Sequence, residues 1–449
     1  MEDVRLNGIT EGVIWKELLK FSAPLLIGNL FQQLYNMVDS IIVGNYVGSE
    51  ALAAVGSSVV IINMVIGFFM GIATGAGVML SQYYGAKDER GVQNTIHTAI
   101  MALFLSGVVV TVIGVLAAST IIRLMHTPAE VEDLSVLYLR IFFLGGVPLV
   151  IYNAGAGLLR AVGDAKRPLY YLIVASIVNI ILDFVFVLYF DMGVAGVAIA
   201  TIIAETVSAV LVMRALMTDD DMYKVHLKKL KIQKNYLESI MRVGFPAGIQ
   251  QSVISFSNVI VQANINVFGA AAVAGAGAYN KVDAFVMLPF MSLSLASTTF
   301  IGQNIGAKKW DRVRKSARSC FALSTGVTVT LSILLLMFGT KIMGIFTDDA
   351  EVIYYGSLMM KWMAPFYFLC SFTNVCSGVI RGSGEAMIPM FIMVGNFCLV
   401  RMVWLAITTR IFGNIHVVFA CYVFTWVTAS IMMMIYYKKG NWLRRYLNE

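Results

Sequence analysis

The sequence predicts an all-α integral membrane protein, with twelve transmembrane helices in two six-helix lobes related by a pseudo-two-fold axis along the membrane normal. Three observations predict this class: an apolar composition, twelve apolar segments long enough to cross a bilayer, and an internal repeat. The chain has 449 residues, of which 59% are hydrophobic and only 13% are charged, and its mean hydropathy is +0.79. A soluble domain does not need so much apolar sequence to fill its core.

Hydropathy places the twelve spans in order along the chain, since a helix needs about 20 apolar residues to cross the hydrocarbon layer. They begin near Trp15, Ala51, Val92, Leu134, Leu169, Val194, Tyr236, Ala271, Val313, Val352, Ile388 and Val417. The first span follows ten polar-rich residues and shows no small-residue cleavage pattern. We therefore expect it to be retained rather than removed as a signal peptide.

The loops between these spans differ strongly in positive charge. From Arg5 to Arg445, 24 Lys and Arg residues fall on the side of the two termini, against Arg123, Lys341 and Arg410 on the opposite side. Because cytoplasmic loops retain Lys and Arg, we expect both termini to lie in the cytoplasm, with the chain in the plasma membrane. This bias also accounts for the net charge of +7, so the basic tracts do not indicate nucleic-acid binding.

The second half of the chain repeats motifs of the first half at an offset of 221 residues. SQYYGAK (81–87) returns as GQNIGAK (302–308), and NAGAGLLRAVGDAKRP (153–168) returns as NVCSGVIRGSGEAMIP (374–389). Each half holds six spans, an even number, so the halves share their topology. We expect an N-terminal lobe at 1–217 and a C-terminal lobe at 236–449. Between them, TDDDMYKVHLKKLKIQKN (218–235) is expected to form a solvated cytoplasmic linker.

The sequence lacks the motifs of an enzyme or of an ATP-driven machine. There is no Gly-rich phosphate loop, and no nucleophile–base pair or metal motif marks an active site. The five cysteines all fall in the second half without a C-x-x-C pair, so metal and disulfide sites are weakly indicated. We expect no bound cofactor, and any work that the protein performs must draw on an ion gradient or on a partner.

Polar residues form a stripe on the first span. In GNLFQQLYNMVDSIIVG (28–44), Asn29, Gln32, Asn36 and Asp39 are three, four and three residues apart, which places them on one helix face. The amides can simply bond neighbouring helices. An ionised carboxylate at mid-bilayer costs about 2.5–3.5 kcal/mol, however, so acids within spans usually face the protein interior and mark an ion path.

A second polar cluster lies on spans five and six. Asn179 and Asp183 are four residues apart on span five, and Thr201 and Glu205 are four apart on span six, so each pair shares a helix face. Together with Asp39, these side chains offer carboxylate, amide and hydroxyl oxygens, which suit a hard cation such as Na+ and equally a shared proton. The sequence therefore predicts a proton site or a Na+ site at Asp39, Asn179, Asp183 and Thr201.

These features resemble the multidrug and toxic compound extrusion (MATE) transporters over essentially the whole chain. The resemblance rests on the segment from Pro24 to Asp39 with its Tyr-Asn-x-x-Asp end, on GxGLLRAxGDAKRP (155–168), and on NKVDAFVMLPFMSLSLASTTFIGQNIGA (280–307). It implies export of bulky, mostly cationic organic compounds, driven by inward flow of protons or Na+, through alternating access of a central cleft. In the DinF-like branch of the family, a cation site of the N-terminal lobe is built by positions that match Asp39, Asn153, Asn179, Asp183 and Thr201.

The resemblance also implies a substrate cavity lined by polar residues of both lobes. We expect its lining to include Asn36, Glu205, Gln251, Asn258, Asn280, Lys281, Asp283 and Arg401. Two questions stay open. Glu205 is either a charge facing the substrate or a buried hydrogen-bonding acid, and Lys281 and Asp283 either line the cleft or neutralise each other as an ion pair. Pro24 is the expected hinge, because it removes a backbone hydrogen bond from span one.

A flippase for lipid-linked precursors, from the wider superfamily, is the alternative function. It would need a larger and more basic cleft and usually has extra spans. We expect a monomer whose partners are organic cations and membrane lipid, with no nucleic-acid partner.

Overall fold

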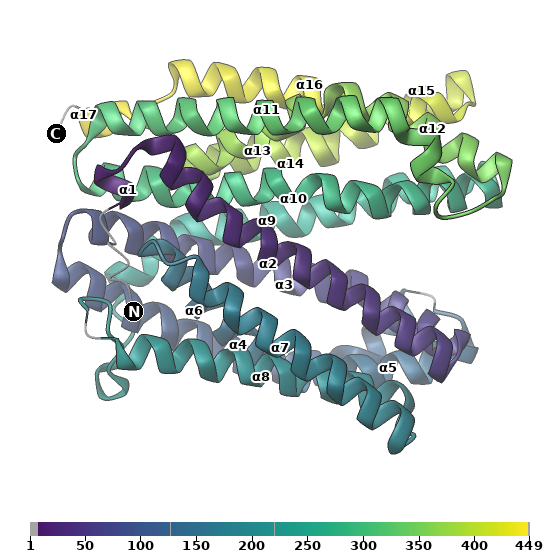
Figure 1. Cartoon of the computed structure of the whole chain (residues 1–449), viewed down its shortest axis with the longest axis horizontal. Helices are drawn as coiled ribbons and strands as arrows, with labels where there is room; N and C mark the ends of the chain where they lie inside the picture. The colour runs from purple at the N-terminus through teal and green to yellow at the C-terminus, as the bar shows by residue number, and fades with distance from the viewer. Residues whose placement is uncertain (1–7, 126, 220, 448–449) are drawn as a thin grey trace. The chain divides into compact units, whose positions relative to one another are not determined.

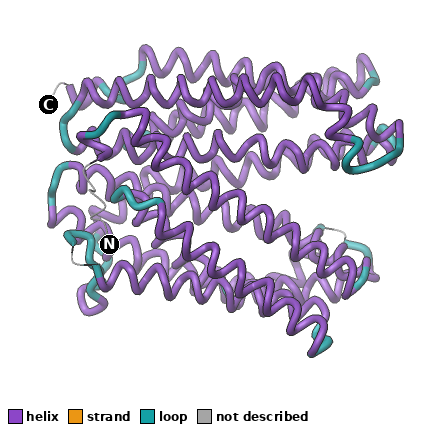
Figure 2. Tube along the Cα trace, viewed as in Figure 1, coloured by secondary structure: helices purple, strands orange, loops and turns teal. Residues whose placement is uncertain are grey.

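The computed structural model describes residues 8–125, 127–219 and 221–447, so Arg5, which contributes to the charge bias, lies outside the described residues. Every regular element in these residues is a helix, and Figure 2 shows helices joined by loops without a strand. The first half (Figure 1) contains α1 (Gly8–Glu11), α2 (Ile14–Ile42), η1 (Val43–Val47), α3 (Ser49–Gly85), α4 (Glu89–Leu124), α5 (Ala129–Leu144), α6 (Gly146–Ala161), α7 (Lys166–Phe184), η2 (Val185–Tyr189), α8 (Gly193–Thr218) and η3 (Leu227–Lys229). The second half contains α9 (Lys234–Asn266), α10 (Ala270–Gly306), α11 (Trp310–Met343), α12 (Ala350–Met363), η4 (Ala364–Phe366), α13 (Tyr367–Gly382), α14 (Met387–Val394), η5 (Gly395–Val400), α15 (Arg401–Phe412), α16 (Ile415–Lys439) and α17 (Arg444–Leu447).

Twelve helical segments correspond to the twelve predicted spans, and each begins within five residues of its predicted start. Nine of the segments in the described residues are long and apolar enough to cross a membrane, and α5 and α6 supply a tenth as a pair bent by 52°. The other two, α2 and α9, have 29 and 33 residues, which is ample to cross. Their amide side chains make them less apolar. The all-α class with two sets of six spans is confirmed.

The internal repeat is visible in the backbone as well as in the motifs. Lys87 follows α3 and Lys308 follows α10, and their φ angles are 56° and 55°. A positive φ is uncommon for a residue other than glycine, so this shared value marks the same turn in both halves. Gly163 and Gly384, also 221 residues apart, have φ angles of 102° and 81°, a region that favours glycine.

The packing of the helices groups the chain into two compact units. Among the described residues, the first contains Ala23–Gly248, and the second contains residues 8–22 and 249–447. Both boundaries fall inside helices, since α2 passes from one unit to the other just before Pro24, and α9 does so just after Pro246. Proline removes a backbone hydrogen bond and so lets a helix bend. Each crossing therefore lies at a position where the helix can change direction.

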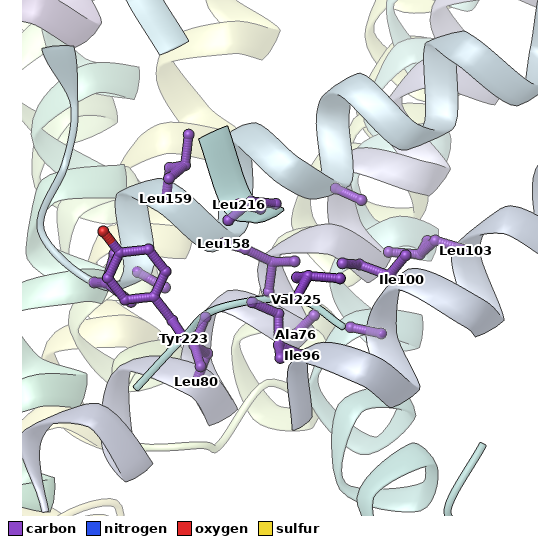
Figure 3. Packing of buried hydrophobic residues seen from close by; sticks show 14 of the residues in the cluster. Ala76, Leu80, Ile96, Ile100, Leu103, Leu158, Leu159, Leu216, Tyr223 and Val225 are labelled. Atoms are coloured by element: carbon purple, nitrogen blue, oxygen red, sulfur yellow. The ribbon is translucent and has the colours of Figure 1, made fainter. Parts of the chain in front are cut away.

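One apolar core cluster of the first unit is formed mainly by α3, α4, α6 and α8, and Figure 3 shows it together with two residues of the linker. These two, Tyr223 and Val225, are 3% and 2% exposed. The side-chain amide of Gln93 on α4 donates to the backbone carbonyls of Met222 and Lys224 at 2.6 and 3.1 Å. The prediction that 218–235 is solvated is therefore wrong for this stretch, because alternate residues turn their apolar side chains into the core.

Candidate functional site

Two carboxylates face each other in the first unit. Asp39 lies on α2, Asp183 lies on α7, and the two side chains interact directly. Asp183 is 0% exposed. Neither of its carboxylate oxygens, nor Oδ1 of Asp39, has a hydrogen-bond donor among the described residues. Two ionised carboxylates in a buried site repel each other unless a cation neutralises them, so this pair has the chemistry to hold a proton or a small cation.

Each of these acids lies next to a π-helical segment. η1 (Val43–Val47) begins four residues after Asp39, and η2 (Val185–Tyr189) begins two residues after Asp183. π-helical turns are rare and occur frequently at functional sites. The two segments contact each other, so the wide turns that follow the two acids meet in the first unit.

A small pocket lies beside the pair, between α2, α6, α7 and α8. Asn179, Thr201 and Glu205 line it together with Tyr35 and Tyr152, and its volume is about 20 Å³, which is room for about one water. Asn179 is 1% exposed. In the part of the chain that the structure describes, both polar atoms of its amide and Oε2 of Glu205 are buried without a hydrogen-bond partner. Buried polar atoms are nearly always paired, so these atoms indicate a site for an ion or a water.

The structure brings four of the five predicted cation-site residues together. Asp39 and Asp183 interact directly, Asn179 precedes Asp183 by one helical turn, and Thr201 lines the same pocket as Asn179. Asn153 on α6 does not line this pocket, and its Nδ2 donates to a backbone carbonyl one turn back at 2.8 Å. Within the described ranges no group of three His, Cys, Asp or Glu side chains is placed to hold a metal ion. A metal ion here would depend on amide and hydroxyl oxygens as well as on carboxylates.

Arg401 is buried among three helices of the second unit. It is 3% exposed, and its Nη1 donates to Oδ1 of Asn258 at 3.0 Å and to Oγ of Ser257 at 3.3 Å. Its guanidinium lies 4.7 Å from the centroid of the Tyr422 ring, within the range of a cation–π contact. These contacts join α9, α15 and α16, and the assignment of Arg401 to the substrate cavity stays a prediction.

Asp283 and Lys281 on α10 do not form the ion pair that was one alternative. Oδ1 of Asp283 accepts hydrogen bonds from the hydroxyls of Tyr279, at 3.3 Å, and of Tyr367. Lys281 is exposed, and its ammonium lies 5.9 Å from the centroid of the Phe346 ring. The remaining predicted cavity residues outside the pocket are also exposed: Asn36, Gln251, Asn258 and Asn280.

Comparison with known families decides what kind of protein carries this site. A family model described as MatE matches two segments, residues 24–185 and 246–407, which together make up more than half of the chain. The chain belongs to the multidrug and toxic compound extrusion (MATE) family of transporters. The two segments matched to MATE begin at Pro24 and Pro246, beside the two points at which a helix passes between the units.

Individual MATE relatives agree with this assignment. The probable multidrug resistance protein YoeA of Bacillus subtilis is 32% identical over 389 residues, which cover 85% of this chain and 84% of YoeA. YpnP, a second probable multidrug resistance protein of that organism, is 27% identical over 435 residues, covering 96% and 97%. A solved structure of a MOP superfamily transporter from Pyrococcus furiosus shares the fold, with a TM-score of 0.90 over 98% of both chains and 22% identity. With its many apolar helices, this MATE chain is a multi-pass membrane protein.

Two tyrosines near Asp39, Asp183 and Glu205 were not predicted from the sequence to belong to the site. Tyr35 on α2 lies within electrostatic range of both Glu205 and Asp39, and Tyr138 on α5 lies within range of Asp39 and Asp183. A signal existed for Tyr35, because it precedes Asp39 by four residues and so shares its helix face. No comparable signal marks Tyr138, whose span carries no polar stripe.

Proposed function

We propose that this MATE family member is a secondary active antiporter. It exports bulky, mostly cationic organic compounds in exchange for protons or Na+, by alternating access of a central cleft. It works as a monomer in the plasma membrane with both termini in the cytoplasm, and it needs no cofactor beyond the coupling ion and no nucleic acid. The observation that carries the proposal is the pair of half-buried Asp39 and buried Asp183, to which the described residues supply no donor for three of the four oxygens.

Further observations support the cytoplasmic location of the termini and the class of substrate. The excess of Lys and Arg in the loops on the side of the termini supports their cytoplasmic location. Two relatives that cover most of the chain are named as probable multidrug resistance proteins, which supports export of varied organic compounds.

The charge of the carboxylate pair links ion binding to conformational change. With a cation bound, the carboxylates of Asp39 and Asp183 can lie together. Without it, two charges about 4 Å apart in an effective dielectric of 20 repel by about 4 kcal/mol. Asp39 and Pro24 both lie on α2, so a bend at the proline moves Asp39 relative to Asp183. An ion gradient that fills the pair from one side and empties it to the other drives the cycle in one direction.

Substrate and coupling ion bind at different places in this proposal. The pocket beside the pair measures about 20 Å³, whereas sites for drug-sized ligands usually measure about 300–1,000 Å³. We assign substrate contact to exposed polar side chains instead: Asn36, Gln251, Asn258, Asn280 and Lys281.

Transport in proteoliposomes tests the proposed function. Ethidium export is followed under a pH gradient without sodium, and separately under a Na+ gradient at equal pH. We expect one of the two gradients to drive export that saturates with ethidium concentration. Export that ignores both gradients would contradict antiport. If the same vesicles instead translocate a lipid-linked anionic precursor, the flippase alternative takes its place.

A further inference from the structure

Four hydroxyls that line the pocket beside the carboxylate pair present oxygen lone pairs rather than hydrogen-bond donors. The hydroxyls of Ser176, Thr201 and Ser208, all of which line it, donate to backbone carbonyls of their own helices at 2.8, 3.0 and 2.9 Å. The hydroxyl of Tyr152 likewise donates to the carbonyl of Pro168 at 3.4 Å. A hydroxyl whose proton is already donated in a hydrogen bond can only accept a further hydrogen bond or bind a cation through its oxygen. These hydroxyls therefore favour a positively charged occupant.

Glu205 adds a carboxylate to this acceptor-rich lining. It lies one helical turn after Thr201 on α8, and its Oε2 is buried with no partner from the described helices. The amide of Asn179, 1% exposed, lines the same pocket with both polar atoms unpaired. Carboxylate, amide and hydroxyl oxygens suit Na+, and a carboxylate in such a site equally accepts a proton. A volume of about 20 Å³ admits one small ion or water and excludes an organic substrate.

The other groups that face Glu205 do not neutralise it. From α2, the hydroxyl of Tyr35 lies within electrostatic range of Glu205 and also of Asp39. From α6, Tyr152 lies within range of Glu205 and of Arg160. No basic group in the described ranges acts directly on Glu205. A cation that enters from outside the protein is therefore the natural partner for this carboxylate.

We infer that Glu205 holds a second monovalent cation, either a proton or Na+, so that the first unit takes up two cations in each transport cycle. This inference rests on the proposed ion coupling by Asp39 and Asp183. Asn179 joins the two positions, because it lines the Glu205 pocket and precedes Asp183 by one turn of α7. At the repeat offset of 221, Glu205 corresponds to Trp426, so the second half has no matching acid.

A second cation changes how export responds to voltage. Two cations exchanged for one monovalent organic cation move one net charge, whereas a one-for-one exchange moves none. Only the two-for-one exchange therefore responds to the membrane potential. A potential of about 100 mV should then change the equilibrium ratio of the substrate by about 50-fold.

Ethidium, a permanently monovalent cation, is the probe for this test in proteoliposomes. Valinomycin and K+ set a potential of about 100 mV, negative in the compartment that the coupling cations enter. One arm uses a pH gradient without sodium and the other a Na+ gradient at equal pH, which identifies the cation. Wild type and Glu205→Asp, which keeps a carboxylate, should shift the ethidium ratio by about 50-fold. Glu205→Gln should lose this response and still transport under the ion gradient, and Glu50→Gln, at an exposed position on α3, should match wild type.

The outcomes separate this inference from the proposed function. A normal voltage response in Glu205→Gln would overturn the second cation at Glu205 and leave antiport intact. Wild-type export that does not respond to the membrane potential would likewise overturn the second cation and leave antiport intact. This wild-type measurement tests the inference even if the Glu205→Gln protein does not fold. A wild type that exports under neither ion gradient would overturn the proposed function, and the inference with it.

Discussion

Replacing Asp183 by asparagine should uncouple export from the ion gradient. The side chain is 0% exposed and interacts directly with Asp39, so Asp183→Asn removes one charge while nearly preserving the size of the group. Repulsion of about 4 kcal/mol between two such carboxylates corresponds to roughly a thousandfold in an equilibrium constant. This repulsion makes the conformation depend on the ion. Without it, a cation bound elsewhere in the unit is no longer linked to the conformational change.

Ethidium accumulation in proteoliposomes measures this loss. A tenfold gradient of the coupling ion supports about a tenfold substrate ratio for each coupled ion, so wild type should reach at least about tenfold and Asp183→Asn should stay near one. Asp191→Asn is the matched control, because Asp191 is exposed after η2 and its φ of 53° is one that asparagine tolerates. The melting temperature of Asp183→Asn should not fall, since a buried carboxylate without a donor does not stabilise the fold. Accumulation at the wild-type level in Asp183→Asn would refute the reasoning.

Three further predictions concern other parts of the chain. Pro24→Ala should slow export more than it weakens equilibrium ethidium binding, because the proline lies where α2 passes between the units; equal losses in the two assays would mark a purely structural proline. Arg401→Ala should lower the free energy of unfolding, measured with a denaturant, by about 3 kcal/mol, since two hydrogen bonds from the charged guanidinium are lost. Lys281→Ala should instead alter the order of substrate preference and leave the free energy of unfolding unchanged. The opposite pattern would place Arg401, and not Lys281, at the substrate. Tyr223→Ala should destabilise the protein by about 3–5 kcal/mol, and Tyr223→Phe should destabilise it by about 1 kcal/mol. Equal effects of the two variants would show that the hydrogen bonds of the Tyr223 hydroxyl with Asp219 and Arg167, rather than the buried ring, anchor the linker.

The helices could be predicted from the sequence because the bilayer dictates their length and the backbone must be satisfied within each span. Even α2 and α9, with their amides, keep apolar residues on the remaining faces. The bend of 52° between α5 and α6 was not predicted, although Gly145 and Gly146 mark it. A Cβ on Gly146 would lie 2.7 Å from the hydroxyl of Thr111, so a larger residue here would displace Thr111, a close approach that only the folded packing reveals.

The candidate site could be predicted only where its residues share one helix. Spacing of four residues paired Asn179 with Asp183 and Thr201 with Glu205. Which faces of α2, α7 and α8 meet depends on packing, so the sequence did not reveal that Tyr35 lies near Glu205. Arg401 shows the same limit, because its hydrogen-bond partners lie 143 and 144 residues earlier in the chain. The linker departs from its predicted solvated state for another reason. Its apolar residues alternate with charged ones, and this pattern leads to burial only where the segment lies against a core.

Ion release on substrate binding tests most directly whether coupling resides in the first half. Ethidium is added to purified protein in weakly buffered detergent solution, and displaced protons and Na+ are followed with a pH electrode and a sodium electrode. The proteins compared are wild type, the double variant Asp39→Asn/Asp183→Asn, and Asp283→Asn, which alters the tyrosine-bonded acid of the second half. We expect release to fall by about half or more in the double variant and to be unchanged in Asp283→Asn, while all three proteins bind ethidium. Undiminished release from the double variant, or its loss in Asp283→Asn, would contradict coupling through Asp39 and Asp183.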